Sequence, residues 1–245
     1  AAHISVAMGQ GGTDVARLRG AGLPVRFLTN TTRRPKRRIL ERLSASGVTA
    51  APGEVFTPVA AAQDRLRRTG HVPHLLVHPD LEEDFAGMTR DGPETVVLGD
   101  AGPAFTYDRL NAAFRALDAG APFLALAANR VFRESDGRLS LDAGAFVKAL
   151  EYASGTEAEV LGKPAPGFFR SAVDSTGRRP EEVAMVGDDA ENDVAGALSA
   201  GLGAGVLVRT GKYRPGDEDR VDPAPTAVAD DLSAAVDWLL ARRQE

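Results

Sequence analysis

Short apolar runs alternate along the chain with segments in which apolar residues recur at helical spacing. Continuous apolar runs bounded by turn residues are typical of buried parallel strands. The runs predict strands at Ile4–Met8, Val25–Leu28, Leu75–Val77, Thr95–Leu98, Phe123–Ala127, Val183–Val186 and Gly205–Val208. This alternation predicts an α/β fold in which helices cover both faces of a parallel sheet.

Two of the intervening helices have readable ends. The segment after Thr32 places Pro35 in its first turn and meets a stop at Gly47, as helix starts and ends commonly do. The segment Pro166–Val173 carries its apolar residues at helical spacing, and Gly177 ends it. Helices in these places suit the crossovers that join parallel strands.

The composition is that of a globular protein, because 43% of the 245 residues are hydrophobic and 26% are charged. The longest uncharged stretch is too short to span a bilayer, and the first ten residues lack the basic and apolar regions of a secretory signal. The absence of cysteine excludes disulfides, thiolate metal sites and cysteine nucleophiles. A formal net charge of −5 gives no general attraction to nucleic acid or anionic membranes. We therefore expect a cytoplasmic protein with a neutral or small polar substrate.

The first candidate site follows the strand predicted at Val25–Leu28. Thr29, Asn30 and Thr31 come directly after it and stand just before a helix whose unpaired N–H groups favour an anion. These residues are a candidate phosphate cradle. The alternative is that Thr31 or Thr32 only caps the following helix.

A second candidate is Lys163, which lies between a glycine and a proline at the start of a predicted helix. In such a rigid place its ammonium projects a point charge toward whatever lies over the sheet. The alternative is a solvent-facing lysine in a turn.

A third candidate is a group of carboxylates after the strand Val183–Val186. Asp188 and Asp189 follow the strand, and Asp193 comes on the next helical turn. Carboxylates at a strand end suit a hard divalent cation, and Mg²⁺ in particular is held by one or two carboxylates plus phosphate and water. Standing alone, these residues could equally cap a helix.

The three candidate sites together suggest an inserted domain. In open α/β sheets, functional residues gather outside the carboxyl ends of the strands, so the three motifs point to one site. The stretch between them is itself a run of strand and helix signals. We expect residues 1–52 and 155–245 to form a core domain and residues 53–154 to form an insertion.

In this order, the motifs resemble the haloacid dehalogenase (HAD) superfamily of phosphotransferases, in the subgroup with a large cap inserted after the second motif. The stretches that carry the resemblance are Phe27–Thr32, Glu54–Thr57, Ala149–Ala153, Gly162–Pro164, Val186–Asp189 and Thr210–Tyr213. The resemblance implies a HAD-like, Rossmannoid sheet with a cap, a hydrolase that acts on a small phosphorylated molecule, and Mg²⁺ as cofactor. The resemblance is compatible with a homodimer, and it does not identify the substrate.

The resemblance also implies roles for individual residues. Thr29, with Asn30 beside it, would bind the transferring phosphoryl group, and Lys163 would neutralise its charge. Asp188 would bind Mg²⁺. Asp193 would hold Lys163 or a metal-bound water in place, and Asp189 would lie behind the metal ligand.

The family's first motif departs from its usual pattern in this chain. The family ends its first strand in Asp-x-Asp-Gly-Thr or Asp-x-Asn-Gly-Thr, and the first Asp attacks phosphorus. The corresponding stretch here is Val6–Thr13, in which Gly9 and Gly11 stand at the carboxylate positions. Asp14 is the nearest acid but lies on the following helix. An alternative alignment places the whole first strand before Ala1, in which case the chain is truncated.

Two other functions remain open. Gly9, Gly11 and Gly12 between a strand and a helix could cradle a dinucleotide, with Arg33 and Arg34 near a 2′-phosphate, although the spacing misses G-x-G-x-x-G. A catalytically silent relative could instead bind a partner through its cap. The basic run that contains both arginines is interpreted as a solvated helix face.

Overall fold

The computed structural model describes residues 2–4, 11–133 and 136–242. The chain divides into two compact units. Unit 1 contains residues 1–29, 37–56 and 163–245, and unit 2 contains residues 30–36 and 57–162. The domain boundaries expected at residues 52 and 155 stay a prediction. In the structure, Pro52 opens a short 3₁₀ helix and Gly155 ends a helix with a left-handed φ of +71°.

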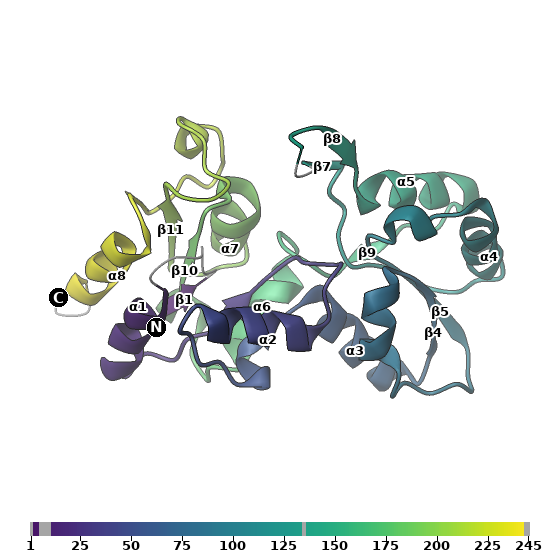
Figure 1. The fold of residues 1–245 in the computed structure, drawn as a ribbon, viewed down its shortest axis with the longest axis horizontal. Coiled ribbons are helices and arrows are strands. Elements are labelled where there is room, and N and C mark those ends of the chain that lie inside the picture. The colour runs from purple at the N-terminus through teal and green to yellow at the C-terminus, as the bar shows by residue number, and fades with distance from the viewer. Residues whose placement is uncertain (1, 5–10, 134–135, 243–245) are drawn as a thin grey trace. The chain divides into compact units, whose positions relative to one another are not determined.

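Unit 1 is built on a parallel sheet (Figure 1). Its strands are β1 (Ala2–Ile4), β2 (Phe27–Leu28), β3 (Val55–Phe56), β10 (Ala184–Gly187), β11 (Ala204–Val208) and β12 (Ala227–Ala229). The order is β1-β10-β11-β12, all parallel, and the parallel pair β2-β3 lies beside β1. Because β1, β10, β11 and β12 all run in the same direction, their carboxyl ends share one edge of the sheet.

Helices cover both faces of this sheet. The helical elements of unit 1 are α1 (Gly11–Gly20), α2 (Lys36–Ala45), η1 (Pro52–Glu54), α6 (Pro166–Asp174), η4 (Pro180–Glu182), η5 (Ala190–Ala195), α7 (Gly196–Ser199), η6 (Asp217–Asp219) and α8 (Leu232–Ala241). Helices α1 and α8 pack together on one face, where Leu18 and Val236 meet Val186 of β10. Helices α6 and α7 cover the other face, where Phe169 meets Met185. Neighbouring residues of β10 thus point to opposite faces, as strand geometry requires.

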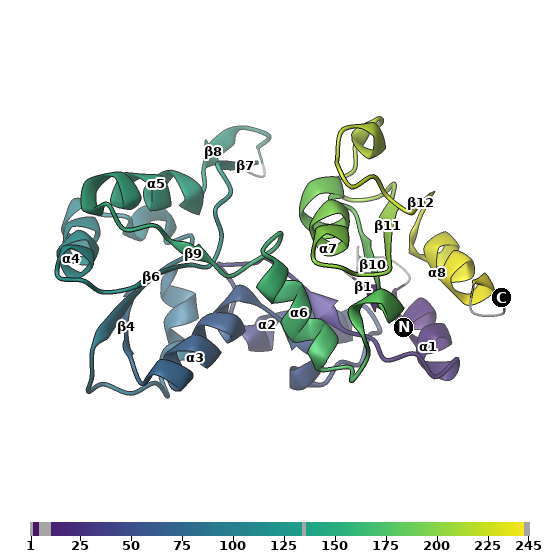
Figure 2. The ribbon, with the colours of Figure 1, turned by 180° about the vertical axis from the view of Figure 1, so that it is seen from behind.

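Unit 2 has its own parallel sheet, in the order β4-β5-β6-β9 (Figure 2). Its elements are α3 (Pro58–Thr69), β4 (Val72–Leu76), η2 (Pro79–Phe85), β5 (Glu94–Leu98), η3 (Gly102–Ala104), α4 (Tyr107–Asp118), β6 (Phe123–Ala125), β7 (Val131–Arg133), β8 (Leu139–Leu141), α5 (Ala143–Ser154) and β9 (Glu159–Val160). Helix α3 packs on one face of the sheet, and α4 and α5 pack on the other. Strands β7 and β8 form a separate antiparallel hairpin.

The predicted α/β architecture is confirmed, and the elements follow the apolar pattern closely. The strands predicted near Leu75, Thr95, Phe123, Val183 and Gly205 correspond to β4, β5, β6, β10 and β11. The strand predicted at the start of the chain overlaps β1 only at its first residue, and residues 5–8 lie outside the described part.

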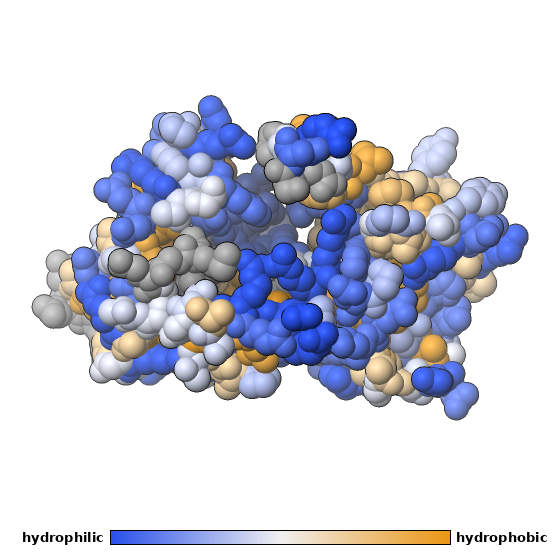
Figure 3. Space-filling model, viewed as in Figure 1, coloured by the Kyte–Doolittle hydropathy of each residue, from blue (hydrophilic) through white to orange (hydrophobic). Residues whose placement is uncertain are grey.

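The surface over α2 is strongly polar. None of the residues of α2 is buried, and its first turn is basic. In Figure 3, the surface in the lower middle of the view, over α2, is largely hydrophilic. Arg37 and Arg38 on this helix pair with Glu41 and are exposed, as the sequence interpretation expects.

Candidate functional site

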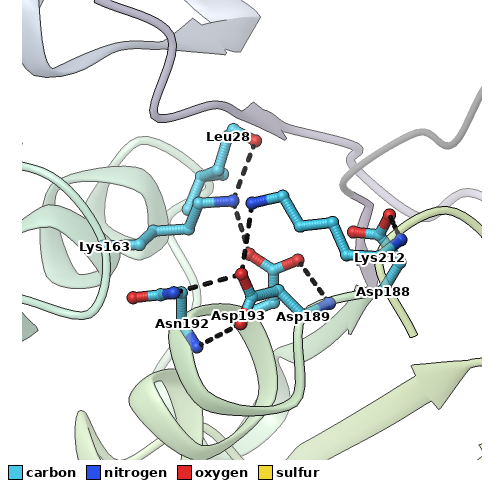
Figure 4. A network of polar contacts seen from close by, with 7 residues as sticks. All are labelled: Leu28, Lys163, Asp188, Asp189, Asn192, Asp193 and Lys212. Carbon is cyan, nitrogen blue, oxygen red and sulfur yellow. Dashed lines mark hydrogen bonds and ion pairs between the residues drawn. The ribbon is translucent and has the colours of Figure 1, made fainter. Parts of the chain in front are cut away.

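Polar side chains gather at the carboxyl edge of the sheet of unit 1. Thr29 follows β2, Asp188 follows β10, and Lys212 stands in the turn after β11. The loop that carries Lys163 leads into α6 and reaches the same edge (Figure 4). Segments that are far apart in the sequence therefore meet where the topology of open α/β sheets places functional residues.

Lys163 and Asp193 form a buried ion pair at the centre of this edge. Lys163 is 8% exposed and Asp193 is 2% exposed, and their Nζ and Oδ1 atoms are 2.5 Å apart. The Lys163 ammonium also donates to the carbonyl oxygen of Leu28 at 3.4 Å. The alternative of a solvent-facing lysine in a turn is therefore wrong, because this ammonium points inward, next to the residue that precedes Thr29.

The turn after β10 is built around carboxylates. Asp189 caps the π-helical turn η5, because its Oδ1 accepts from the backbone N–H of Asn192 at 2.9 Å. The Oδ2 of Asp193 accepts from the backbone N–H of Asp189 at 3.4 Å. Gly187 is required here, because a Cβ at this position would lie 2.3 Å from the same Asp193 oxygen. Asp189 thus has the capping role that the sequence left open.

Lys212 belongs to the site, although sequence reasoning assigned it no role. Its backbone N–H donates to Oδ2 of Asp188 at 2.9 Å, and its ammonium pairs with Oδ2 of Asp189 at 3.2 Å. The turn depends on Gly211, whose φ is +58° and at which a Cβ would lie 1.8 Å from Asp188 Oδ2. The stretch Thr210–Tyr213 is part of the family resemblance, and that was the available signal.

The charges in the network shift one another's protonation. Burial raises the pKa of the Asp193 carboxyl, and the Lys163 ammonium opposes part of that rise. Burial alone would raise the pKa of Asp189, but hydrogen bonds from Asn192 and the charge of Lys212 bring it below its usual value. Burial works against the charged form of Lys212, yet the carboxylates around it raise its pKa. Three carboxylates and two ammonium groups leave this edge with a net negative charge, which a cation would balance.

The structure places the remaining predicted residues as follows. The backbone N–H of Thr29 donates to the carbonyl of Phe56 at 3.1 Å, which fixes Thr29 at the end of β2. Asn30 belongs to unit 2, where its side-chain oxygen lies 2.8 Å from the position that a Cβ on Gly162 would take.

The degenerate first motif is only partly described. Gly9 lies outside the described residues, and Gly11 is the first residue of α1. No aspartate or glutamate precedes Asp14 in the sequence. Asp14 is buried in α1, accepts from the hydroxyl of Ser233 at 2.6 Å and pairs with Arg17 at 3.3 Å, so it stabilises the packing of α1 on α8.

Among the described residues, no helix combines the length and apolar character that crossing a membrane requires.

Comparisons with known proteins agree with this arrangement. A family model described as haloacid dehalogenase-like hydrolase matches residues 10–88, and a HAD-hydrolase-like model matches residues 160–235. The phospholysine phosphohistidine inorganic pyrophosphate phosphatase of Danio rerio is 45% identical over 231 residues, which are 94% of this chain and 85% of that protein. The haloacid dehalogenase-like hydrolase domain-containing protein 2 of Homo sapiens is 43% identical over 239 residues, 97% of this chain and 92% of the relative.

Solved structures share the fold along nearly the whole chain. The p-nitrophenyl phosphatase from Archaeoglobus fulgidus has a TM-score of 0.85 at 25% identity, and the likeness covers 97% of this chain and 98% of that one. The 4-nitrophenylphosphatase from Thermotoga maritima has a TM-score of 0.84 at 26% identity, with 96% of each chain covered. These similarities favour the hydrolase fold over the dinucleotide-binding alternative.

Proposed function

The chain belongs to the haloacid dehalogenase-like hydrolases, and we propose that the network around Lys163 is the phosphate- and magnesium-binding part of a phosphatase site. One observation carries this proposal. A buried ammonium is held by Asp193 and by the carbonyl of Leu28, and Leu28 directly precedes Thr29 in the chain. Such a preorganised charge stabilises a phosphoryl group without having to reorganise water.

In this proposal, the residues of unit 1 divide the work on the phosphate. Thr29 donates its hydroxyl to a phosphoryl oxygen, and Lys163 neutralises the anion's charge. Asp193 acts through Lys163, because its carboxylate holds the buried ammonium in place. The substrate class is a small phosphorylated molecule, in keeping with the phosphatases among the relatives.

The residues present fit magnesium in its usual protein environment. The groups that follow β10 offer carboxylate oxygens, which are the donors that Mg²⁺ prefers. Asp188 is the residue that would hold the ion, and the Lys212 N–H and the tight turn at Gly211 fix one of its oxygens. Among the described residues, no group of three His, Cys, Asp or Glu side chains could enclose a metal ion. The ion would therefore rely on phosphate and water for its other ligands, and it would supply positive charge beside the phosphoryl group.

Hydrolysis by this chain is expected to stay near background. The family's reaction begins with attack by an aspartate after the first strand, and no acid precedes Asp14. Asp14 itself is engaged with Ser233 and Arg17, and Asp189 is engaged as a helix cap. Removing the nucleophile from a cooperating site abolishes most of its catalysis.

Unit 2 serves as the cap in this proposal. Its main stretch, residues 57–162, interrupts unit 1 and has its own sheet and its own two apolar layers.

The lack of cysteine in the sequence suits a reducing compartment, and the proposal places the protein in the cytoplasm. Light scattering would establish whether the protein is a homodimer.

Binding is tested by calorimetric titration with inorganic phosphate, with and without MgCl₂. We expect phosphate to bind more tightly when Mg²⁺ is present, and Asp188→Asn should remove that difference. Asp230→Asn is the matched control, because Asp230 is an exposed carboxylate of the same unit. Absence of phosphate binding with and without Mg²⁺, or equal binding by the Asp188 variant, would contradict the proposed site.

Catalysis is tested with p-nitrophenyl phosphate. The unmodified chain should hydrolyse it near background, and the double variant Gly9→Asp, Gly11→Asp should gain Mg²⁺-dependent turnover. The matched control replaces the same glycines with asparagine, which adds similar bulk without a carboxylate. Robust metal-dependent turnover by the unmodified chain would refute the loss of the nucleophile.

A further inference from the structure

The chain changes units immediately after Thr29. Thr29 is the last residue of the first stretch of unit 1, and residues 30–36 belong to unit 2. The backbone then returns to unit 1 at residue 37. The backbone that leaves the proposed phosphate-binding residue is thus built into the other unit, which a simple insertion at residue 57 would not require.

Arg33 attaches this short segment to unit 2. Its Nε donates to Oδ2 of Asp100 at 2.5 Å, and its Nη2 donates to Oδ1 at 3.3 Å. Asp100 is only 6% exposed and also accepts from the backbone N–H of Gly102 at 3.0 Å. The guanidinium lies over the ring of Phe132, with 4.6 Å between Cζ and the ring centroid. Two parallel donors, a buried acceptor and a stacked ring fix the arginine far better than a single surface ion pair does.

Two other contacts join the segment to unit 2. Thr32 is buried, and its Cβ lies 3.6 Å from the position that a Cβ on Gly99 would occupy. The backbone N–H of Lys36 donates to Oδ2 of Asp84 at 3.1 Å. The segment is therefore attached to unit 2 near its middle and at its end, and Arg33 provides the charged contact. The interpretation of the whole basic run as a solvated helix face is wrong for Arg33.

We propose that Arg33 is a positioning residue that makes the backbone after Thr29 move with unit 2, so that phosphate bound at Thr29 and the placement of unit 2 are coupled. The phosphate half of this inference rests on the proposed function. Coupling of this kind is reciprocal: if attachment of the segment changes phosphate affinity, bound phosphate changes the equilibrium of that attachment by the same free energy. Asp100 is the partner through which Arg33 acts, and neither residue touches the phosphoryl group.

The attachment itself is tested by amide hydrogen exchange of the full chain without ligand. In Arg33→Met, the amides of residues 31–34 should exchange about tenfold faster or more, because the segment opens locally once its charged contact is lost. Asp100→Asn should have a similar effect. Arg34→Met is the matched control, since Arg34 is the exposed neighbour and its loss should leave exchange unchanged. Equal exchange in Arg33→Met and the parent would overturn the attachment.

The coupling is tested by titration of the same variants with inorganic phosphate in the presence of MgCl₂. Arg33→Met should weaken phosphate binding about fivefold or more, the low end of common coupling strengths. Arg33→Lys keeps the positive charge but cannot donate two parallel hydrogen bonds to Asp100, so it should recover only part of the phosphate affinity. Faster exchange with unchanged phosphate affinity would show a merely structural arginine and overturn the proposal. If the parent chain binds no phosphate, the proposed function fails while the exchange result still decides the attachment.

Discussion

Replacing Lys163 with methionine should destabilise unit 1 strongly at neutral pH. The change removes the ammonium that lies 2.5 Å from Asp193 and keeps a long unbranched side chain in its place. Asp193 is 2% exposed, and it would retain only the 3.4 Å hydrogen bond from the backbone N–H of Asp189. Breaking a buried pair and leaving one charge uncompensated costs about 3–5 kcal/mol.

This loss is large compared with the whole stability of an ordinary domain, which is about 5–15 kcal/mol. For a chain of this size it corresponds to a fall of roughly 6–20 °C in Tm, at about 2–4 °C per kcal/mol. Urea denaturation followed by circular dichroism measures the free energy of unfolding directly. The double variant Lys163→Met, Asp193→Asn should recover most of the loss, because it no longer buries an unpaired charge.

The pH dependence gives an independent check. Without Lys163, the folded-state pKa of Asp193 rises further, so its carboxyl takes up a proton more readily in the folded than in the unfolded chain. A group of this kind stabilises the fold in acid, and that stabilisation is lost as the pH rises through the folded pKa. The destabilisation of Lys163→Met should therefore be smaller at acidic pH than at pH 7. A single-variant loss below about 1 kcal/mol at pH 7, with no recovery in the double variant, would refute the reasoning.

Other substitutions test separate features of the structure. Gly211→Ala forces a Cβ to within 1.8 Å of Asp188 Oδ2 at a left-handed φ, and calorimetry should show that it loses Mg²⁺-dependent phosphate binding. Gly203→Ala places a Cβ 2.0 Å from the carbonyl of Glu181 and should lower the free energy of unfolding by about 1–3 kcal/mol in urea denaturation. Burial raises the pKa of Asp142, which caps α5, so its charge lowers stability as the pH rises through the folded pKa. Asp142→Asn keeps the cap, so its free energy of unfolding relative to that of the parent should be higher at pH 7 than at pH 4. An equal difference between variant and parent at the two pH values would contradict the raised pKa of Asp142.

The sequence predicted the central strands well because they are buried on both faces. Strands β10 and β11 consist of continuous apolar residues followed by a change to polar ones, and that pattern requires no knowledge of the tertiary structure. The hairpin β7-β8 and strands β9 and β12 were not predicted. They have two or three residues each, too few to show a period, and their pairing partners determine them.

The candidate site was predictable where residues directly follow a strand. Thr29 and Asp188 stand at such places, and parallel topology brings strand ends to one edge. Lys212 could not be placed, because its contact with Asp189 depends on the turn that Gly211 makes after β11. The partner of Arg33 could not be predicted either, because no local sequence pattern connects this basic run to Asp100, which follows β5.

The split composition of unit 2 limits how homologous proteins can be recombined. A chimera that exchanges only residues 57–162 takes Asp100 and Phe132 from one parent and keeps Arg33 from the other. Any crossover within residues 37–56 separates the two stretches in the same way. An exchange that carries residues 30–36 along with the insert keeps Arg33, Asp100 and Phe132 from the same parent. Over evolutionary time, a change at position 33 or 100 should persist mainly when the other position accommodates it.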